Sequence, residues 1–146
     1  MQDPQDLSDG GFGQITYPSA SPFEIHHILC KMDEAVEHPV FGSLLVPENP
    51  SEGPMPCVVA VHGSLNWRGH HHEHIVRWLD AGICVFRVHS FDSRSVYSVV
   101  EDQMQVTHAM MLADCYQALR MLSTHPSIDE SRIGIAGWSL GGTVAL

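Results

Sequence analysis

The 146-residue sequence has few basic residues, no long apolar run and no closely spaced cysteines. Its 7 Lys and Arg face 17 Asp and Glu, and a formal net charge of −10 without a basic cluster argues against nucleic acid or anionic lipid as a partner. No stretch approaches the roughly 18 apolar residues that a membrane span needs, and residues 1–6 lack the basic and apolar order of a signal peptide. We therefore expect a cytoplasmic protein.

Disulfide bonds are not expected, because the four cysteines are scattered without C-x-x-C spacing and three of them lie in apolar runs. With 44% hydrophobic and 16% charged residues, the composition is that of a globular domain with one core. Residues 1–22, rich in Gly, Pro, Ser and Asp, predict an irregular N-terminal segment, and residues 23–146 are expected to form the domain. Residues 23–30 alternate weakly in hydropathy, which predicts an edge strand in a hairpin with residues 40–46.

Three short apolar runs rich in β-branched residues predict buried strands at 57–61, 83–88 and 132–136. Two segments with apolar residues at helical spacing, 70–80 and 104–122, lie between these strands. Alternating strands and helices with short links indicate βαβ units, whose right-handed crossovers build a parallel sheet. The sequence thus predicts an α/β fold with a mostly parallel sheet flanked by helices.

The strongest chemical signal is Gly137-Trp138-Ser139-Leu140-Gly141, a G-x-S-x-G motif between the last predicted strand and a stretch that can begin a helix. At such a turn the serine backbone is strained, and the flanking glycines remove side chains that would collide with the neighbouring strand and helix. Ser139 is therefore the predicted nucleophile. Trp138 is a candidate for lining the acyl pocket, although packing explains a large aromatic residue there equally well.

Acyl transfer at a serine needs hydrogen-bond donors for the oxyanion that develops. The backbone N–H of Leu140, at the start of the expected helix, is one candidate. The N–H of Ser64, or alternatively of Leu65, in the loop after the strand at 57–61 is the second. We expect His62, which opens this loop, to organise it by hydrogen bonding rather than to act as a base.

Four stretches resemble the amino-terminal portion of the dienelactone hydrolase-like family of α/β-hydrolases: Val59–Ser64, Arg68–His71, the helix from Asp114 to Leu122, and Asp129–Gly142. The resemblance covers about two thirds of the chain. It implies hydrolysis of an ester, lactone or related acyl bond of a small molecule by a nucleophile, histidine and aspartate triad without a cofactor. Dienelactone hydrolase itself has a cysteine in the elbow, so its particular lactone substrate does not carry over to Ser139.

In α/β-hydrolases the triad acid and histidine follow the serine in the chain, but residues 140–146 contain no Asp, Glu or His. We therefore expect a truncated enzyme that ends after the nucleophile elbow and is inactive by itself. An internal substitute for the base is His89, with Asp92 close enough to orient it. Truncation would leave the strand at 132–136 as an exposed edge, so we expect the isolated chain to be marginally stable or self-associating.

Two other functions stay open. The stretch His70-His71-His72-Glu73-His74 contains H-x-x-E-H, in which His70 and His74 would bind zinc and Glu73 would act as general base. Zinc would need a third protein ligand, and we expect no metal or other cofactor here. The second alternative, a non-catalytic module on the same scaffold, does not explain why a strained serine is kept.

Overall fold

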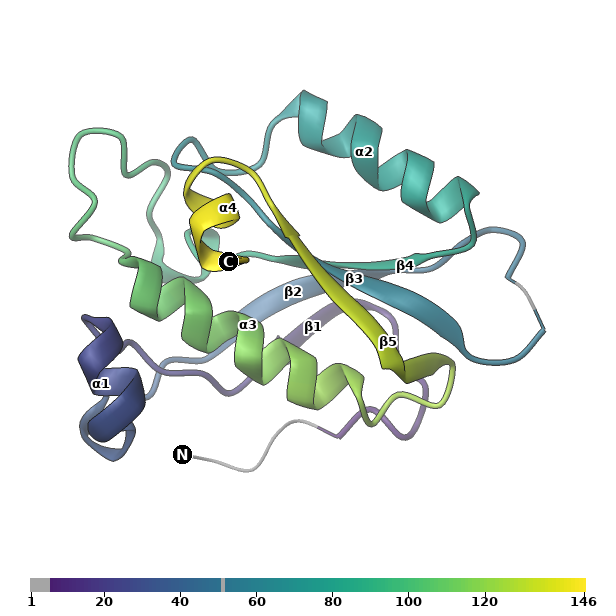
Figure 1. Ribbon diagram of the computed structural model, residues 1–146, viewed down its shortest axis with the longest axis horizontal. Coiled ribbons are helices and arrows are strands. Elements are labelled where there is room, and N and C mark those ends of the chain that lie inside the picture. The colour runs from purple at the N-terminus through teal and green to yellow at the C-terminus, as the bar shows by residue number, and fades with distance from the viewer. Residues whose placement is uncertain (1–5, 51) are drawn as a thin grey trace.

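A computed structural model describes residues 6–50 and 52–146 (Figure 1). The elements in chain order are β1 (Gly13–Tyr17), α1 (Ile25–Cys30), η1 (Met32–Glu34), β2 (Val40–Leu45), β3 (Met55–Val61), α2 (Gly69–Asp80), β4 (Cys84–Val88), η2 (Asp92–Arg94), α3 (His108–Leu122), β5 (Ile128–Gly137) and α4 (Leu140–Val144). Figure 1 shows α2 and α3 on opposite sides of the sheet. Among the described residues no helix has the length and apolar character needed to cross a membrane.

The strands of the described residues form one sheet in the order β1-β2-β4-β3-β5. β3 pairs in parallel with β4 and β5, whereas β2 pairs antiparallel with β1 and β4. The predicted α/β fold is confirmed, but the sheet is mixed rather than mostly parallel, because the antiparallel pair of β1 and β2 is added to its β4 edge. The three parallel strands end at one edge of the sheet, where open α/β sheets place their sites.

Two apolar layers hold the helices to the sheet. The larger core lies between the sheet and α3, where Val59 of β3 and Phe86 of β4 pack with Met111. On the opposite face, Ala60 and Val85 belong to a smaller core under α2. Since neighbouring residues of a strand point to opposite faces, the continuous apolar runs predicted as buried strands serve both layers.

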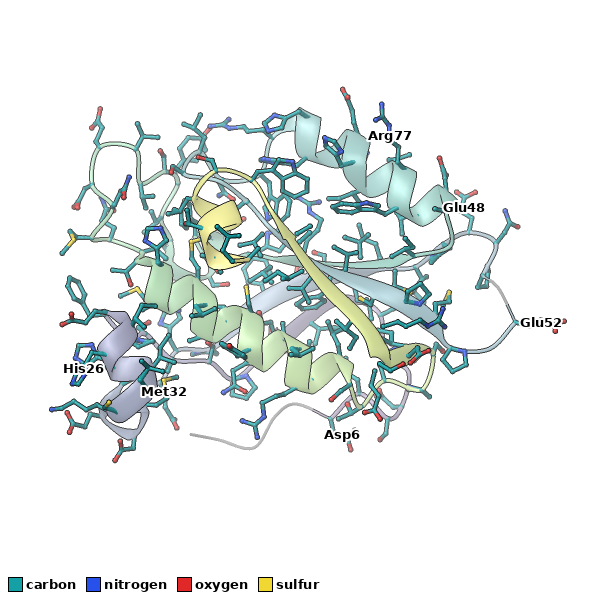
Figure 2. The ribbon with its side chains drawn as sticks, in the orientation of Figure 1. Asp6, His26, Met32, Glu48, Glu52 and Arg77 are labelled. Carbon is teal, nitrogen blue, oxygen red and sulfur yellow. The ribbon has the colours of Figure 1, made fainter. Side chains whose placement is uncertain are left out.

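The segment at 23–30 corrects the sequence prediction, because it forms α1 rather than an edge strand. Glu24 and His27 cap the helix reciprocally, with the Glu24 N–H donating to His27 Nδ1 at 3.2 Å. No residue of α1 is buried, and Figure 2 shows His26 at the periphery of the molecule. The weak alternation in this segment therefore does not mark a face that packs on a core.

The antiparallel partner of β2 is β1, which lies inside the N-terminal segment predicted to be irregular. Ile15 and Tyr17 are buried, and the residues between and before them are exposed, as in a strand with one face on the core. The prediction for residues 6–22 is therefore wrong at β1, and residues 1–5 lie outside the described residues. The predicted strand at 40–46 is confirmed as β2.

The remaining elements follow the predictions closely. β3, α2 and β4 match the expected strand, helix and strand, and β5 contains the predicted strand at 132–136. The helix expected from residue 104 begins at His108, because Thr107 is its N-cap and accepts a hydrogen bond from the Met110 N–H at 3.3 Å. Met104 lies outside the helix and is 59% exposed, so it is not part of the core.

A buried ion pair fixes the chain after β4 onto α3. The Arg94 guanidinium donates two hydrogen bonds to the Asp114 carboxylate, at 2.7 and 3.0 Å, and the Asp114 side chain is fully buried. Ser19 Oγ donates to the same carboxylate at 2.6 Å. The second Arg94 amino group also reaches the Ala20 carbonyl at 3.1 Å, so the pair links the N-terminal segment, η2 and α3.

Candidate active site

Ser139 lies at the turn between β5 and α4 and is exposed to solvent. Its backbone has φ 51° and ψ −116°, a left-handed conformation that is costly for any residue with a side chain. Among the described non-glycine residues only Asn66 and Ser95 share a positive φ. The strained and exposed serine expected from the G-x-S-x-G motif is thus present, and its role as nucleophile stays a prediction.

Gly137 and Gly141 permit this turn because neither position has room for a side chain. A Cβ on Gly137 would overlap the carbonyl group of Gly141, and a Cβ on Gly141 would overlap the carbonyl oxygen of Val61. The Trp138 N–H donates to that same Val61 oxygen at 3.1 Å, which ties the start of the turn to the end of β3. The motif therefore works as the sequence predicts, by close backbone contact on both sides of the serine.

The loop after β3 lies beside the elbow. A Cβ on Gly63 would sit 3.0 Å from the Trp138 carbonyl oxygen and 3.4 Å from the Cβ of Ser139. The next residue is held in place by its carbonyl, because Ser64 O accepts a hydrogen bond from the Val99 N–H at 3.0 Å. The structure thus brings together the nucleophile candidate and the loop from which the second oxyanion donor is expected.

Asn66 shapes this loop and was not among the predicted site residues. It has φ 63°, its N–H donates to Gly63 O at 2.9 Å, and its side-chain amide donates to Asp92 Oδ1 at 2.7 Å. Asparagine tolerates the left-handed region better than most residues, which is the signal in the sequence that could have identified it. The N–H groups of Leu140 and Ser64 stay the predicted oxyanion donors.

His62 is buried at the base of the same loop. Its Nδ1 lies 2.9 Å from the Gly63 carbonyl oxygen, to which it donates, and its ring packs edge-on against Phe91 with 4.3 Å between centroids. Burial lowers the pKa of His62 to about 4, because the charged ring would lose its hydration. These contacts support the predicted role in organising the loop, and burial holds the imidazole neutral.

The Trp138 ring points into the layer between the sheet and α2. Its centroid lies 4.7 Å from the ring of His71, 5.7 Å from that of His74 and 5.8 Å from that of Trp78. These three contacts favour packing as the reason for a tryptophan beside the serine. A part in lining the acyl pocket stays a prediction.

The H-x-x-E-H motif lies on α2, as predicted from its helical context. His70, Glu73 and His74 are exposed, whereas His71 between them is buried and accepts a hydrogen bond from the Arg68 N–H at 2.9 Å. The described residues contain no group of three or more His, Cys, Asp or Glu side chains arranged to hold a metal ion. The third ligand that the zinc hypothesis requires is therefore not supplied by this part of the chain.

His89, the internal candidate for a base, forms part of a different cluster. Its Nδ1 lies 3.1 Å from Asp92 Oδ2, so Asp92 does orient the ring as the sequence suggested. Its Nε2, however, lies 3.1 Å from the hydroxyl of Ser43 on β2. Both ring nitrogens are engaged by residues other than Ser139.

Residues 90–146 match the family model for acetyl xylan esterase, a segment that includes α3, β5 and the elbow. A dienelactone hydrolase-like promiscuous phosphotriesterase from metagenomic libraries is similar in structure, with a TM-score of 0.57, 19% identity, and coverage of 91% of this chain and 52% of its own. An acetyl xylan esterase from Paenibacillus sp. R4 has a TM-score of 0.58, 19% identity, and coverage of 91% and 44%. No match is found among the curated proteins.

Est1E from Butyrivibrio proteoclasticus, solved with ferulic acid bound, has a TM-score of 0.59 at 18% identity, over 73% of this chain and 41% of its own. The chain thus spans about half the length of these solved structures, or less. At such low identity the likeness establishes the fold, and the residues of the elbow give the local detail. The chain has the fold of the amino-terminal portion of the α/β-hydrolases, and it resembles the dienelactone hydrolase-like proteins and acetyl xylan esterases among them.

Proposed function

We propose that this chain carries the nucleophile half of a serine hydrolase, which cleaves an ester, lactone or related acyl bond through an acyl-enzyme at Ser139. The observation that carries the proposal is the backbone of Ser139, left-handed and exposed between two glycines that have no room for side chains. A scaffold without catalytic function has no need of this strain. The match of residues 90–146 to acetyl xylan esterase supports an ester as the substrate class.

The chemistry would begin with attack of Ser139 Oγ on the acyl carbon. The N–H groups of Leu140 and Ser64 would donate to the oxyanion, and the close approach of Gly63 to Ser139 supports this placement of the loop. Collapse of the tetrahedral intermediate expels the alcohol and leaves the acyl-enzyme, which water then hydrolyses. Both steps need a base, because a serine hydroxyl is a weak nucleophile until its proton is removed.

The base is the part of the mechanism that neither His62 nor His89, the histidines that follow β3 and β4, supplies. His62 is buried and hydrogen-bonded to Gly63, and His89 is bonded to Ser43 and Asp92. We therefore propose that these 146 residues alone hold the nucleophile and oxyanion donors without the base, and that Ser139 is inactive until further polypeptide supplies a histidine and an acid.

Chemical rescue tests this proposal. The chain and its Ser139→Ala variant are treated with p-nitrophenyl acetate with and without added imidazole, and the acetylated residue is located by tandem mass spectrometry. We expect little acetylation of Ser139 without imidazole and a clear increase with it, above that of Ser95, an exposed serine with a comparable positive φ. If imidazole raises the acetylation of Ser139 no more than that of Ser95 in a folded sample, the elbow does not activate its serine and the non-catalytic module is favoured.

A further inference from the structure

A second serine of the chain contacts a histidine that is itself held by a carboxylate. Ser43 Oγ on β2 lies 3.1 Å from His89 Nε2, and His89 Nδ1 lies 3.1 Å from Asp92 Oδ2. A hydroxyl, an imidazole and a carboxylate linked in this order form the arrangement that activates a serine as a nucleophile. None of these residues belongs to the elbow or the loop beside it.

The positions of the protons follow from the partners. A carboxylate can only accept, so the His89 nitrogen facing Asp92 carries the proton and donates it. The other nitrogen, Nε2, is then free of a proton and accepts the hydroxyl hydrogen of Ser43. Burial lowers the pKa of His89 below its ordinary value, with Arg87 adding to this and Asp92 opposing it, so the ring is neutral at neutral pH. His89 is therefore in the state that a general base requires.

The histidine and the carboxylate of the cluster are each held from a second side. The Asn66 amide donates to the free carboxylate oxygen of Asp92 at 2.7 Å. The His89 ring stacks on Phe41, with 4.9 Å between centroids and 18° between planes, and the backbone N–H of His89 donates to Phe41 O at 3.1 Å. The histidine and the carboxylate are thus fixed before any ligand arrives, as preorganised catalytic groups are.

A cation leaves the sheet on the same face as the hydroxyl. Ser43 and Arg87 are directly opposite each other in the antiparallel pair of β2 and β4, so their side chains leave the same face of the sheet. The Arg87 guanidinium stacks over Trp67 at 4.5 Å, and its Nε is buried without a hydrogen-bond partner in the part of the chain that the structure describes. A guanidinium on this face suits the negative charge that develops when an ester is attacked.

We propose that Ser43, His89 and Asp92, with Arg87 as the cation, form a second nucleophilic site that reacts with small activated carboxylic and phosphonic esters. Ser43 Oγ forms the bond to the acyl carbon or phosphorus while its proton passes to His89 Nε2. The bond to the leaving group breaks, and the leaving group departs with the electron pair and takes up the proton. Ser43 is half-buried and the side chains of His89 and Asp92 are 12% and 43% exposed, so a small reagent can reach the cluster from solvent.

The site is tested by locating the adduct of a fluorophosphonate on the 146-residue chain. The background is Ser139→Ala, so that the outcome does not depend on the elbow, and Ser43→Ala, His89→Gln and Asp92→Asn are added to it one at a time. We expect an adduct on Ser43 that disappears in Ser43→Ala. In His89→Gln its rate of formation should fall at least about tenfold. Ser95, exposed and within the same digest, serves as the unactivated control.

The pH dependence separates activation from mere exposure. The rate at Ser43 should rise as His89 loses its proton, with a midpoint below about pH 6.5, the ordinary pKa of a histidine. Asp92→Asn, which keeps the shape of the side chain, should slow labelling and shift this profile even where His89→Gln lowers stability. An unlabelled Ser43 in a sample with a normal thermal transition overturns the proposal, and so does a rate equal to that of Ser95 or unchanged in both His89 and Asp92 variants.

Discussion

At the scale of single residues, the elbow depends on the absence of side chains at particular positions. A Cβ on Gly141 would collide with the carbonyl groups that end β3, whereas a Cβ on Gly134 of β5 would meet nothing within 4 Å. We expect Gly141→Ala to lower the free energy of unfolding by about 2–3 kcal/mol, because the backbone must move to relieve the overlap. Gly134→Ala, the matched control, should change it by less than about 0.5 kcal/mol. Urea unfolding measures both, and equal effects would contradict the close packing of the elbow.

Two buried histidines should make the fold sensitive to acid. Burial lowers the pKa of both His62 and His71 to about 4, while an unfolded chain titrates its histidines near 6.5. Between these values the unfolded state binds more protons, so the stability present above about pH 6.5 is lost as the pH falls toward 4. We expect a loss on the order of a few kcal/mol, visible in urea unfolding at a series of pH values.

The matched comparison for this acid sensitivity is His108, an exposed histidine on α3. His62→Gln and His71→Gln should each flatten the dependence of stability on pH, although both also lose packing contacts at neutral pH. His108→Gln should leave the dependence unchanged. The origin assigned to the acid sensitivity is wrong if the two buried positions show the same slope as the wild type.

Local chemistry explains which site residues could be predicted. Ser139 could be identified because Gly137 and Gly141 stand at fixed spacing on either side of it. Both glycines permit close backbone contacts within the same turn. The contact between Ser43 and His89 could not be identified from the sequence, because it requires the antiparallel register of β2 against β4, which no local pattern specifies. Sequence reasoning accordingly paired His89 with Asp92, three residues away, but had no means to bring it to Ser43.

At the scale of elements, predictions succeeded where apolar patterns were long or continuous. β3 and α2 were recognisable because one is an unbroken apolar run and the other has helical spacing with a clear end. α1 was mistaken for a strand because none of its few apolar residues is buried, so they carry no information about a buried face. β1 was missed because only Ile15 and Tyr17 mark its buried side, within a segment rich in glycine and proline.

The ion pair between η2 and α3 should contribute more to stability than any exposed pair. Asp114→Ala leaves the Arg94 guanidinium, whose side chain is 6% exposed, without its carboxylate. We expect a loss of about 3–5 kcal/mol in the free energy of unfolding, because the desolvated charge is no longer compensated. Glu34→Ala removes the exposed pair with Lys31 and should cost less than about 1 kcal/mol. Thermal and urea unfolding of the two variants give the comparison, and similar losses would show that burial of the pair is not what matters.

At the scale of the whole molecule, the parallel strands gather the chemistry at one edge. His62 follows β3, His89 follows β4 and Ser139 follows β5, so the sheet alone brings these residues to its carboxyl edge. That edge could be predicted from the alternation of strands and helices. The lateral order of the strands could not be predicted in this way. This order places Ser139 beside the loop of His62, whereas His89 faces β2 on the other side of β4.

The outer edge of β5 bears on whether the chain associates with other copies of itself. Within the described residues β5 pairs only with β3, and an apolar groove of about 460 Å³ runs between β5, α3 and α4. Ile135 of β5 and Tyr116 of α3 line the groove and are 41% and 56% exposed. An open edge strand beside apolar side chains is a template for pairing with another chain.

We therefore expect the 146-residue chain to self-associate in dilute solution, with sedimentation velocity showing a mass that rises with concentration. Ile135→Lys places a charge at the edge strand and in the groove, and it should shift the chain toward the monomer. Val76→Lys, at a position of α2 that is exposed to a similar degree (39% against 41%), adds the same charge away from the edge and should not. A monomer at all concentrations with one sharp unfolding transition would contradict the expectation, because it would mean that the edge and the groove are tolerated in water without a partner.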